Sequence, residues 1–145
     1  MTEHPSTISR RHQSLSRRIW KECATYPPLP RITITIPNFP WIIDVRATKT
    51  SYVTLEDVVD TIYASLRKTL SRSDLYAVAS KLAPTDQYYA ARAYEHRYGN
   101  RRSAEFYDDE KRRSLRRVDF LVGRTHFMGL VNNSRKSDQW QLNTR

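Results

Sequence analysis

Cysteine, glycine and long apolar runs are scarce in this chain of 145 residues, and each scarcity excludes a class of protein. The single cysteine, Cys23, cannot form an internal disulfide. The three glycines do not form a phosphate-binding loop, so nucleotide binding is not predicted. No run approaches the roughly 18 apolar residues of a membrane span, and residues 1–30 lack the apolar centre of a signal peptide. We therefore expect an intracellular protein, cytoplasmic or nuclear, with no membrane span.

Basic residues, by contrast, are abundant. Lysine and arginine number 25 against 15 aspartate and glutamate residues, which gives a formal net charge of +10. Such a charge attracts nucleic acid, anionic lipid and acidic proteins, but it is not a site by itself. The cations are also spread out, with eight in residues 31–96 and eight in residues 97–117. A track dedicated to phosphate would be more concentrated than this.

Two regions of the chain differ in composition. Residues 1–20 are rich in serine, threonine, arginine and histidine and have few apolar positions, so we predict a basic flexible N-terminal arm. Residues 21–145 carry most of the aliphatic and aromatic side chains. We predict that they form a single globular α+β domain.

Alternating residues predict two strands near the start of this domain. Residues 31–36 place three isoleucines on one face and polar residues on the other, which is the pattern of a half-buried strand. Prolines at residues 37 and 40 end this run, and the β-rich residues 41–45 follow it. We predict that the two strands pair as a hairpin.

The centre of the chain is predicted to be helical. Apolar residues recur at helical spacing over residues 55–70, and Thr54 with Asp57 has the pattern of a capping box. Ser71 with Asp74 repeats this start signal for a second helix.

Two more helices are predicted after residue 83. Pro84 suits the first position of a helix, and Gly99 suits its end. Ser103 can cap a fourth helix over residues 104–113, in which acidic residues precede basic ones as the helix dipole prefers. We therefore expect three to four central helices.

The C-terminal part returns to a period of two. Gly123 and Arg124 form a two-residue turn between residues 117–122 and 125–131, which predicts a hairpin covered on both faces. Residues 140–142 would add a closing edge strand.

These elements predict an α+β fold with a small, mainly antiparallel sheet that packs against three to four central helices. The sheet would combine the N-terminal strands with the C-terminal hairpin. We expect the core to contain apolar residues from both layers: Ile34, Val59, Ile62, Leu66, Val118, Phe120 and Phe127.

The order of elements resembles an uncharacterised domain family common in mushroom-forming (basidiomycete) fungi. The likeness covers most of the chain after about residue 20, and its motifs are structural in character. It rests on the runs LPRITITIPNFPWIIDV, VTLEDVVDTIYASLRKTLS, AYEHRYGNR and RRVDFLVGRTHFMGL, with the later Trp140 and Leu142. The resemblance implies a fungal source and supports the predicted fold. Because no activity is established for that family, it implies no catalytic residue, cofactor or partner.

Asp119 and His126 form the one polar pair that the predicted hairpin brings together. As diagonal neighbours, they are close enough for the carboxylate to orient the imidazole. Because no nucleophile lies beside them in the sequence and Arg117 is an equally good partner for Asp119, we interpret the pair as structural, with an acid–base pair as the alternative. The four histidines and the cysteine lack metal-ligand spacing. We therefore predict no catalytic residue, no metal and no cofactor.

Tyrosine and arginine alternate in residues 88–102. Rings that stack on bases beside arginines that neutralise phosphates would make a surface for RNA or single-stranded DNA. On a helix, however, Tyr94 and Tyr98 are neighbours on one side, as core-facing residues would be. Tyr89, Arg92 and His96 lie on another side. Core packing beside a solvated basic face is therefore the alternative. The nucleic-acid surface would consist of Arg92, Arg97, Tyr98, Arg101, Arg102, Arg113 and Arg116.

We predict from these observations a non-catalytic intracellular interaction module whose basic exterior binds a protein or another acidic surface. A protein that binds RNA or single-stranded DNA through the tyrosine and arginine residues and the basic arm is the alternative. An open sheet edge would permit a homodimer, but the sequence does not identify that edge.

Overall fold

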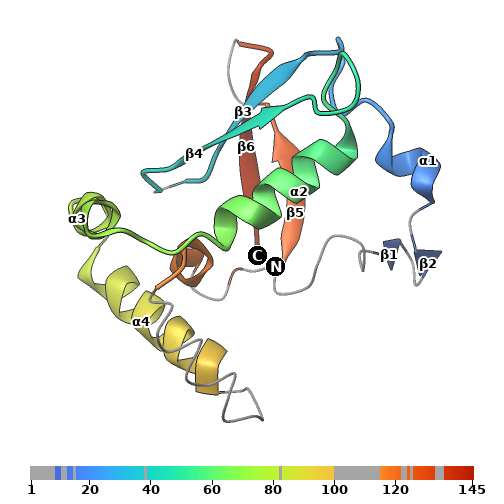
Figure 1. Ribbon diagram of the computed structural model, residues 1–145. Helices are drawn as coiled ribbons and strands as arrows, with labels where there is room; N and C mark the ends of the chain where they lie inside the picture. Colours follow the sequence, from blue (N-terminus) through green and yellow to red (C-terminus); the bar gives the residue numbers. More distant parts are fainter. Residues whose placement is uncertain are drawn as a thin grey trace.

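The chain forms an α+β fold with one four-stranded sheet and several helices, as predicted (Figure 1). A computed structural model describes residues 9–10, 13–14, 16–37, 39–81, 83–99, 115–121, 124, 126–132 and 136–145. The helices are α1 (Arg17–Trp20), α2 (Leu55–Leu66), α3 (Arg72–Ala79), α4 (Pro84–Gly99) and the 3-10 helix η2 (Arg117–Leu121). The strands are β1 (Ser9–Arg10), β2 (Gln13–Ser14), β3 (Arg31–Thr35), β4 (Ile42–Arg46), β5 (Phe127–Val131) and β6 (Gln139–Thr144).

β3 and β4 form the predicted N-terminal hairpin. They pair antiparallel, with Ile32 opposite Val45 and Ile34 opposite Ile43. All four side chains are buried, because alternate residues of the two strands point to the same face. The hairpin predicted from the alternating isoleucines is confirmed.

β6 lies inside the sheet and not at its edge. The strand order is β4-β3-β6-β5, in which β6 is parallel to β3 and antiparallel to β5. The edge strand predicted at residues 140–142 is therefore wrong in position, and the sheet is mixed rather than mainly antiparallel. Leu142 is fully buried and Trp140 packs against the core, as expected for a strand with a neighbour on each side.

η2 replaces the first strand of the predicted C-terminal hairpin. Asp119, Phe120 and Leu121 are buried at consecutive positions, whereas the side chains of a strand alternate between two faces. The Asp119 carboxylate accepts a hydrogen bond at 2.8 Å from the main-chain N–H of Arg116, at the start of this turn. The hairpin predicted around residues 123–124 is therefore wrong.

The C-terminal hairpin consists instead of β5 and β6. Leu130 lies opposite Leu142, and a register shift falls between Phe127 and Gly129. Because β5 is the last strand of the sheet, Phe127 is 44% exposed, and its predicted place in the core is wrong.

α2 crosses one face of the sheet, and the main core lies between the two layers (Figure 1). The predicted core positions Ile34, Ile62 and Leu66 are confirmed, and Val118 packs against this core while Val59 is half-buried. The buried members are Ile32, Ile34, Ile36, Ile43, Val45, Val53, Val58, Ile62, Leu66, Leu121 and Leu142.

A second hydrophobic cluster joins the sheet to α3, α4 and η2. It contains the predicted core residue Phe120 together with Trp41, Leu70, Val78 and Ala90. Figure 1 shows α3 and α4 projecting beyond the end of α2, so this cluster holds them to the remainder of the domain.

Both predicted capping boxes are present. The Thr54 hydroxyl accepts a hydrogen bond from Asp57 N, and the Asp57 carboxylate accepts one from Thr54 N at 2.9 Å. Ser71 and Asp74 repeat these two bonds at the start of α3. Each box satisfies main-chain N–H groups that the first turn of a helix leaves without partners.

α2 ends at Leu66, four residues before its predicted end. The residues that follow pair with a distant part of the chain: Leu70 N donates to Leu115 O at 2.9 Å, and Arg117 N donates to Lys68 O at 3.1 Å. Because these bonds require an extended backbone, the helix cannot continue through them.

Other predictions fall partly outside the described residues. α4 begins at Pro84 and reaches Gly99, as predicted. The helix predicted over residues 104–113 lies outside them, as does much of the predicted arm at residues 1–20. The part of the arm that forms α1 contacts α2. The boundary between arm and domain stays a prediction.

Candidate interaction surface on helix α4

α4 has one side buried in the second cluster and one side open to solvent. Ala90 is buried, and Tyr94 lies half-buried one turn later. On the opposite side, Tyr88 is 61% exposed and Tyr89 is 53% exposed, and Arg92 follows one turn after them. Residues three and four apart are neighbours on a helix. Tyr88, Tyr89, Arg92 and the exposed His96 therefore share one surface, the α4 face.

The tyrosines of the α4 face pack against each other and leave much of each ring in solvent. The rings of Tyr88 and Tyr89 meet edge to face, with centroids 5.7 Å apart. This geometry is favourable for aromatic pairs. The α4 face thus presents two rings whose apolar surfaces remain available for a partner.

Arg92 adds a positive charge that is only loosely engaged. Its guanidinium lies 4.0 Å from the Glu95 carboxylate, and both side chains are more than half exposed. Ion pairs at such exposure contribute little to stability, because water and salt screen them. Arg92 can therefore exchange Glu95 for an anionic group of a partner at small cost.

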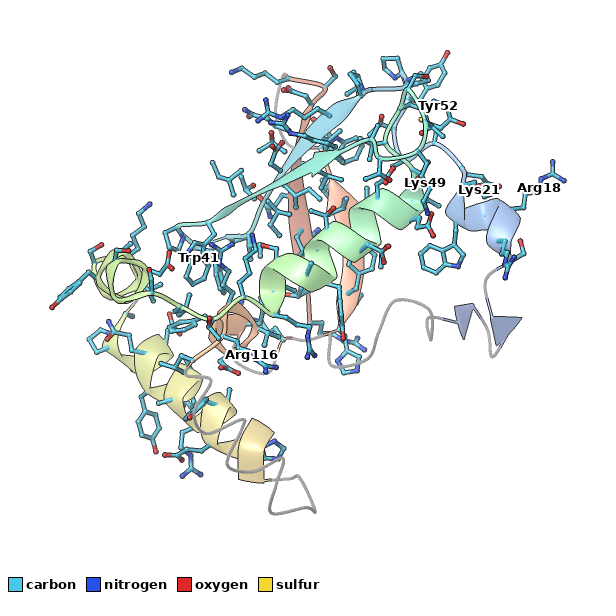
Figure 2. The ribbon with its side chains drawn as sticks, in the orientation of Figure 1. Arg18, Lys21, Trp41, Lys49, Tyr52 and Arg116 are labelled. Atoms are coloured by element: carbon cyan, nitrogen blue, oxygen red, sulfur yellow. The ribbon has the colours of Figure 1, made fainter. Side chains whose placement is uncertain are left out.

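The second cluster fixes the orientation of this surface. Trp41 precedes β4 (Figure 2). It packs edge to face on Phe120 with centroids 5.9 Å apart, and its ring nitrogen donates to Asp74 Oδ1 at 3.2 Å. The Arg117 guanidinium carbon lies 5.0 Å from the centre of the Trp41 ring. α4 packs against η2, so these contacts hold the tyrosines outward.

The structure separates the residues of the predicted nucleic-acid surface. Arg92 lies on the α4 face. Arg97 and Tyr98 belong to α4, but their side chains lie outside the described residues, as do Arg101, Arg102 and Arg113 altogether. Arg116 is 4% exposed and therefore does not contribute to an exposed surface (Figure 2). It is buried where residues 115–117 pair with residues 68–70, which join α2 to α3.

Asp119 and His126 are not cross-strand neighbours. Asp119 is buried in η2, where its carboxylate accepts from Arg116 N, whereas His126 is exposed and exchanges two main-chain hydrogen bonds with Arg145. The hairpin register that would make them diagonal neighbours does not form, because η2 replaces its first strand.

A separate charged group lies on the face of the sheet opposite α2. Asp44 accepts hydrogen bonds from Arg31 Nε and Arg46 Nε, the latter at 2.9 Å. These two bonds lower the pKa of Asp44 below its ordinary value of 3.8. All three residues are exposed, so we interpret the group as a solvated ion-pair network that contributes little to stability.

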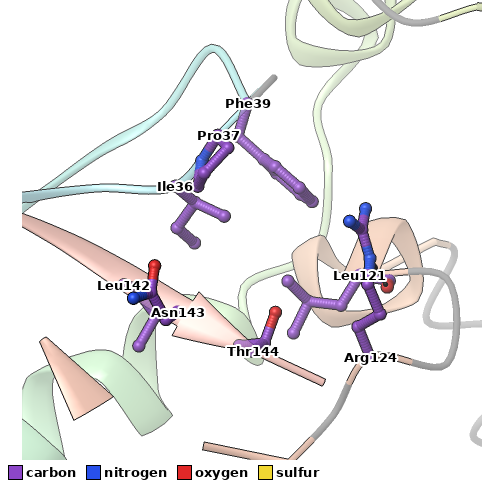
Figure 3. Close-up of a pocket in the computed structure, with 8 residues that line it drawn as sticks. All are labelled: Ile36, Pro37, Phe39, Leu121, Arg124, Leu142, Asn143 and Thr144. Atoms are coloured by element: carbon purple, nitrogen blue, oxygen red, sulfur yellow. Dashed lines mark hydrogen bonds between the residues drawn. The ribbon is translucent and has the colours of Figure 1, made fainter. Parts of the chain in front are cut away.

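A small cavity opens where β3 and β6 end near η2 (Figure 3). Its volume of about 160 Å³ lies below the usual range of sites for small ligands. Buried side chains line its floor, and Arg124, Asn143 and Thr144 contribute polar groups at its rim; the remaining lining residues are Ile36, Pro37, Phe39, Leu121 and Leu142.

The described residues contain no helix whose length and apolar character would let it cross a membrane. Within the same ranges, no three histidine, cysteine, aspartate or glutamate residues gather as metal ligands would.

Helical spacing in the sequence indicates most of the α4 face. Counting from Pro84 places Tyr89 and His96 away from Tyr94, and the structure has this arrangement. Helical spacing alone does not predict the exposure of Tyr88, because it does not give the width of the apolar side of α4.

Comparisons with known proteins give one match. Residues 1–139 match the profile of a family of unknown function, DUF6699. No curated protein and no solved structure matches the chain.

Proposed function

The chain belongs to DUF6699, a family of unknown function, and from this premise we propose that it is a non-catalytic interaction module whose α4 face binds an acidic partner protein. The observation that carries this proposal is the exposure of Tyr88 and Tyr89 beside Arg92. We further propose an intracellular protein of fungal origin, in keeping with the single cysteine and the resemblance of its motifs.

The residue types of the α4 face favour protein binding. Tyrosine and arginine are enriched at protein interfaces and among the residues that contribute most to affinity. Tyr88 and Tyr89 bring large apolar surface on a rigid helix, so little side-chain entropy is lost when they are covered. Arg92 gives such a contact an anionic preference.

The charge of the whole chain favours an acidic partner. With a net charge of +10, the protein attracts acidic surfaces over a distance of about one Debye length. Long-range attraction speeds the encounter, and short-range contacts at the α4 face would supply specificity.

A protein that binds single-stranded nucleic acid is the second candidate. Nucleic-acid bases stack on exposed aromatic rings, and a nearby cation attracts the phosphates. Tyr88 and Tyr89 supply two such rings about one helical turn before Arg92. Of the predicted set, Arg92 supports this candidate, whereas the buried Arg116 does not.

Fluorescence anisotropy on the full chain tests both candidates. The probes are labelled poly-glutamate and a labelled single-stranded RNA of mixed sequence, each at physiological salt. We expect the double variant Tyr88→Ala/Tyr89→Ala to bind poly-glutamate at least about tenfold more weakly than the wild type. Tyr76→Ala is the matched control, because Tyr76 is an exposed tyrosine on α3.

The two probes separate the candidates. Preference for poly-glutamate that the double variant loses supports protein binding. Preference for RNA that the double variant loses supports the second candidate instead. If the double variant and Tyr76→Ala bind both probes as the wild type does, the α4 face is not a binding surface.

A further inference from the structure

A proline-rich connection of sequence YPPLP leads from α1 to β3. Each proline holds its own φ near −65° and pushes the residue before it toward extended backbone. Pro27 and Leu29 each precede a proline, so both are held in this way. The chain runs without a bend through Pro28 and Leu29, and bends at Pro27 and Pro30 mark the ends. These constraints favour a short polyproline II helix over residues 27–30, the proline segment.

One edge of the proline segment is held by the fold. The Leu29 side chain is half-buried against the main core. Its carbonyl accepts a hydrogen bond at 2.8 Å from Val53 N, and the Pro30 carbonyl accepts one at 3.0 Å from Ala47 N. Both donors lie in the loop between β4 and α2. The segment therefore keeps one orientation relative to the domain.

The other two edges of the proline segment are open to solvent. A polyproline II helix has three residues per turn, so Pro27 and Pro30 share one edge. Pro28 lies on a second edge and Leu29 on the third. The three prolines are exposed and Leu29 is not, which agrees with this geometry. Tyr26, joined to Pro27 by a cis peptide bond, lies just before the segment and is 98% exposed.

We propose that the proline segment binds a partner protein through a groove lined with aromatic side chains, of the kind found in SH3 and WW domains. Such grooves receive the proline edges of a polyproline II helix, and Pro27 with Pro30 has the PxxP spacing that they recognise. Because the domain already holds Leu29 and its carbonyl, little chain entropy is lost on binding.

Charge indicates that acidic residues flank the groove of the partner. Arg31 follows the proline segment directly, and Lys49 belongs to the loop that holds it (Figure 2). Their side chains are 59% and 73% exposed, so water and salt screen their ion pairs with Asp44 and Glu56. Both cations can therefore exchange these carboxylates for acidic groups of a partner at small cost.

A second PxxP spacing in the chain lacks the extended conformation. Pro37 and Pro40 have this spacing, but Phe39 N donates to Ile36 O at 3.1 Å, which closes a turn. Phe39 and Pro40 are also half-buried. This stretch matches the sequence pattern without its geometry, so it provides an internal control.

Surface plasmon resonance tests the proposal, with the full chain passed over an array of purified, immobilised SH3 and WW domains at physiological salt. We expect at least one domain to bind the wild type, and Pro27→Ala/Pro30→Ala to weaken this binding at least about tenfold. Pro37→Ala/Pro40→Ala is the matched control, because it removes two prolines of the same spacing from a turn. It should bind as the wild type does.

Tyr26→Ala is a second variant that leaves the prolines in place. Removing two prolines loosens the backbone, whereas the ring of Tyr26 is almost fully exposed and can be removed without loss of core packing. A groove that covers Pro27 also covers part of this ring. We expect an affinity at least about threefold lower than that of the wild type, with an unchanged melting temperature.

Three results would overturn the proposal. The first is that no domain of the array binds the wild type. The second is binding that either Pro27→Ala/Pro30→Ala or Tyr26→Ala leaves unchanged. The third is an equal loss in Pro37→Ala/Pro40→Ala.

These results are separate from polyanion binding at the α4 face. Figure 1 places the connection from α1 to β3 at the end of the sheet away from α4. Tyr88→Ala/Tyr89→Ala should therefore bind the array as the wild type does, because variants of distant sites usually act independently.

Discussion

At the scale of single residues, Trp41 makes aromatic, cation–π and hydrogen-bond contacts at once. Its ring packs against Phe39 and Phe120, receives the Arg117 guanidinium on its face and donates a hydrogen bond to Asp74. Trp41 therefore links the start of β4 to α3 and η2. The orientation of α4 depends on this link, because Ala90 of α4 belongs to the same cluster.

Replacing this ring tests its structural role. Trp41→Phe keeps an aromatic ring but removes the donor to Asp74 Oδ1 and leaves unfilled space. We expect the free energy of unfolding to fall by about 1–3 kcal/mol. Urea denaturation followed by circular dichroism measures it, with Tyr76→Phe as an exposed aromatic control. An unchanged midpoint for Trp41→Phe would contradict the role given to this residue.

The carboxyl of Asp57 should make the free energy of unfolding depend on pH. Burial raises the pKa of its carboxyl, but hydrogen bonds from Thr48 Oγ1 and from Thr54 outweigh burial and hold this pKa below its ordinary value of 3.8. A carboxyl with a lowered pKa stabilises the folded state above its unfolded-state pKa of about 3.9. That stabilisation is lost as the pH falls through the lower folded-state pKa.

The stability difference between wild type and Asp57→Asn should therefore shrink in acid. We expect Asp57→Asn to be less stable than the wild type at neutral pH and closer to it below about pH 4. Urea denaturation of both proteins across this range measures the difference. A difference that stays constant or grows as the pH falls would show that the charge of Asp57 does not stabilise the fold.

At the scale of elements, the capping box of Thr54 and Asp57 determines locally where α2 begins. Thr54→Ala removes the hydroxyl that accepts from Asp57 N, and we expect a loss of about 1 kcal/mol in the free energy of unfolding. Thr54→Ser keeps the hydroxyl and should retain most of the stability. Chemical denaturation of the two variants distinguishes a capping effect from a packing effect. Equal losses would point to packing of the Thr54 methyl group.

Elements with a clear period or start signal were predictable from sequence. Strand β3 follows from the alternation of isoleucines, and the starts of α2 and α3 follow from Ser or Thr with Asp three residues later. These signals act between residues close in sequence, so no knowledge of the remainder of the fold is needed.

Elements set by distant contacts were not predictable. The segment 117–121 has only five residues. In so short a segment, the spacing of apolar side chains does not distinguish a strand from a helical turn. The parallel pairing of β3 with β6 joins residues more than 100 positions apart, and nothing local to residues 139–144 indicates it. The basic residues around Arg116 predict an exposed side chain. Arg116 is buried in the structure, where its segment pairs with residues 68–70.

At the scale of the whole molecule, the α4 face combines short-range contacts with the long-range attraction of the net charge. It presents two exposed tyrosines beside a loosely engaged arginine. The chain carries a formal net charge of +10, which attracts acidic groups from a distance of about one Debye length. Because salt screens this attraction, affinity for a polyanion should fall as salt rises.

The most direct test of the central proposal compares two arginines in a salt series. Arg92→Ala and Arg18→Ala each remove one charge, but Arg92 lies on the α4 face and Arg18 on α1 at the other end of the molecule (Figure 2). Affinity for poly-glutamate is measured by anisotropy from low to physiological salt. We predict wild-type binding that persists at physiological salt, and a loss at least about fivefold larger for Arg92→Ala than for Arg18→Ala. Equal losses, with binding that disappears as salt rises, would mean that only the net charge attracts the polyanion and would contradict the proposal.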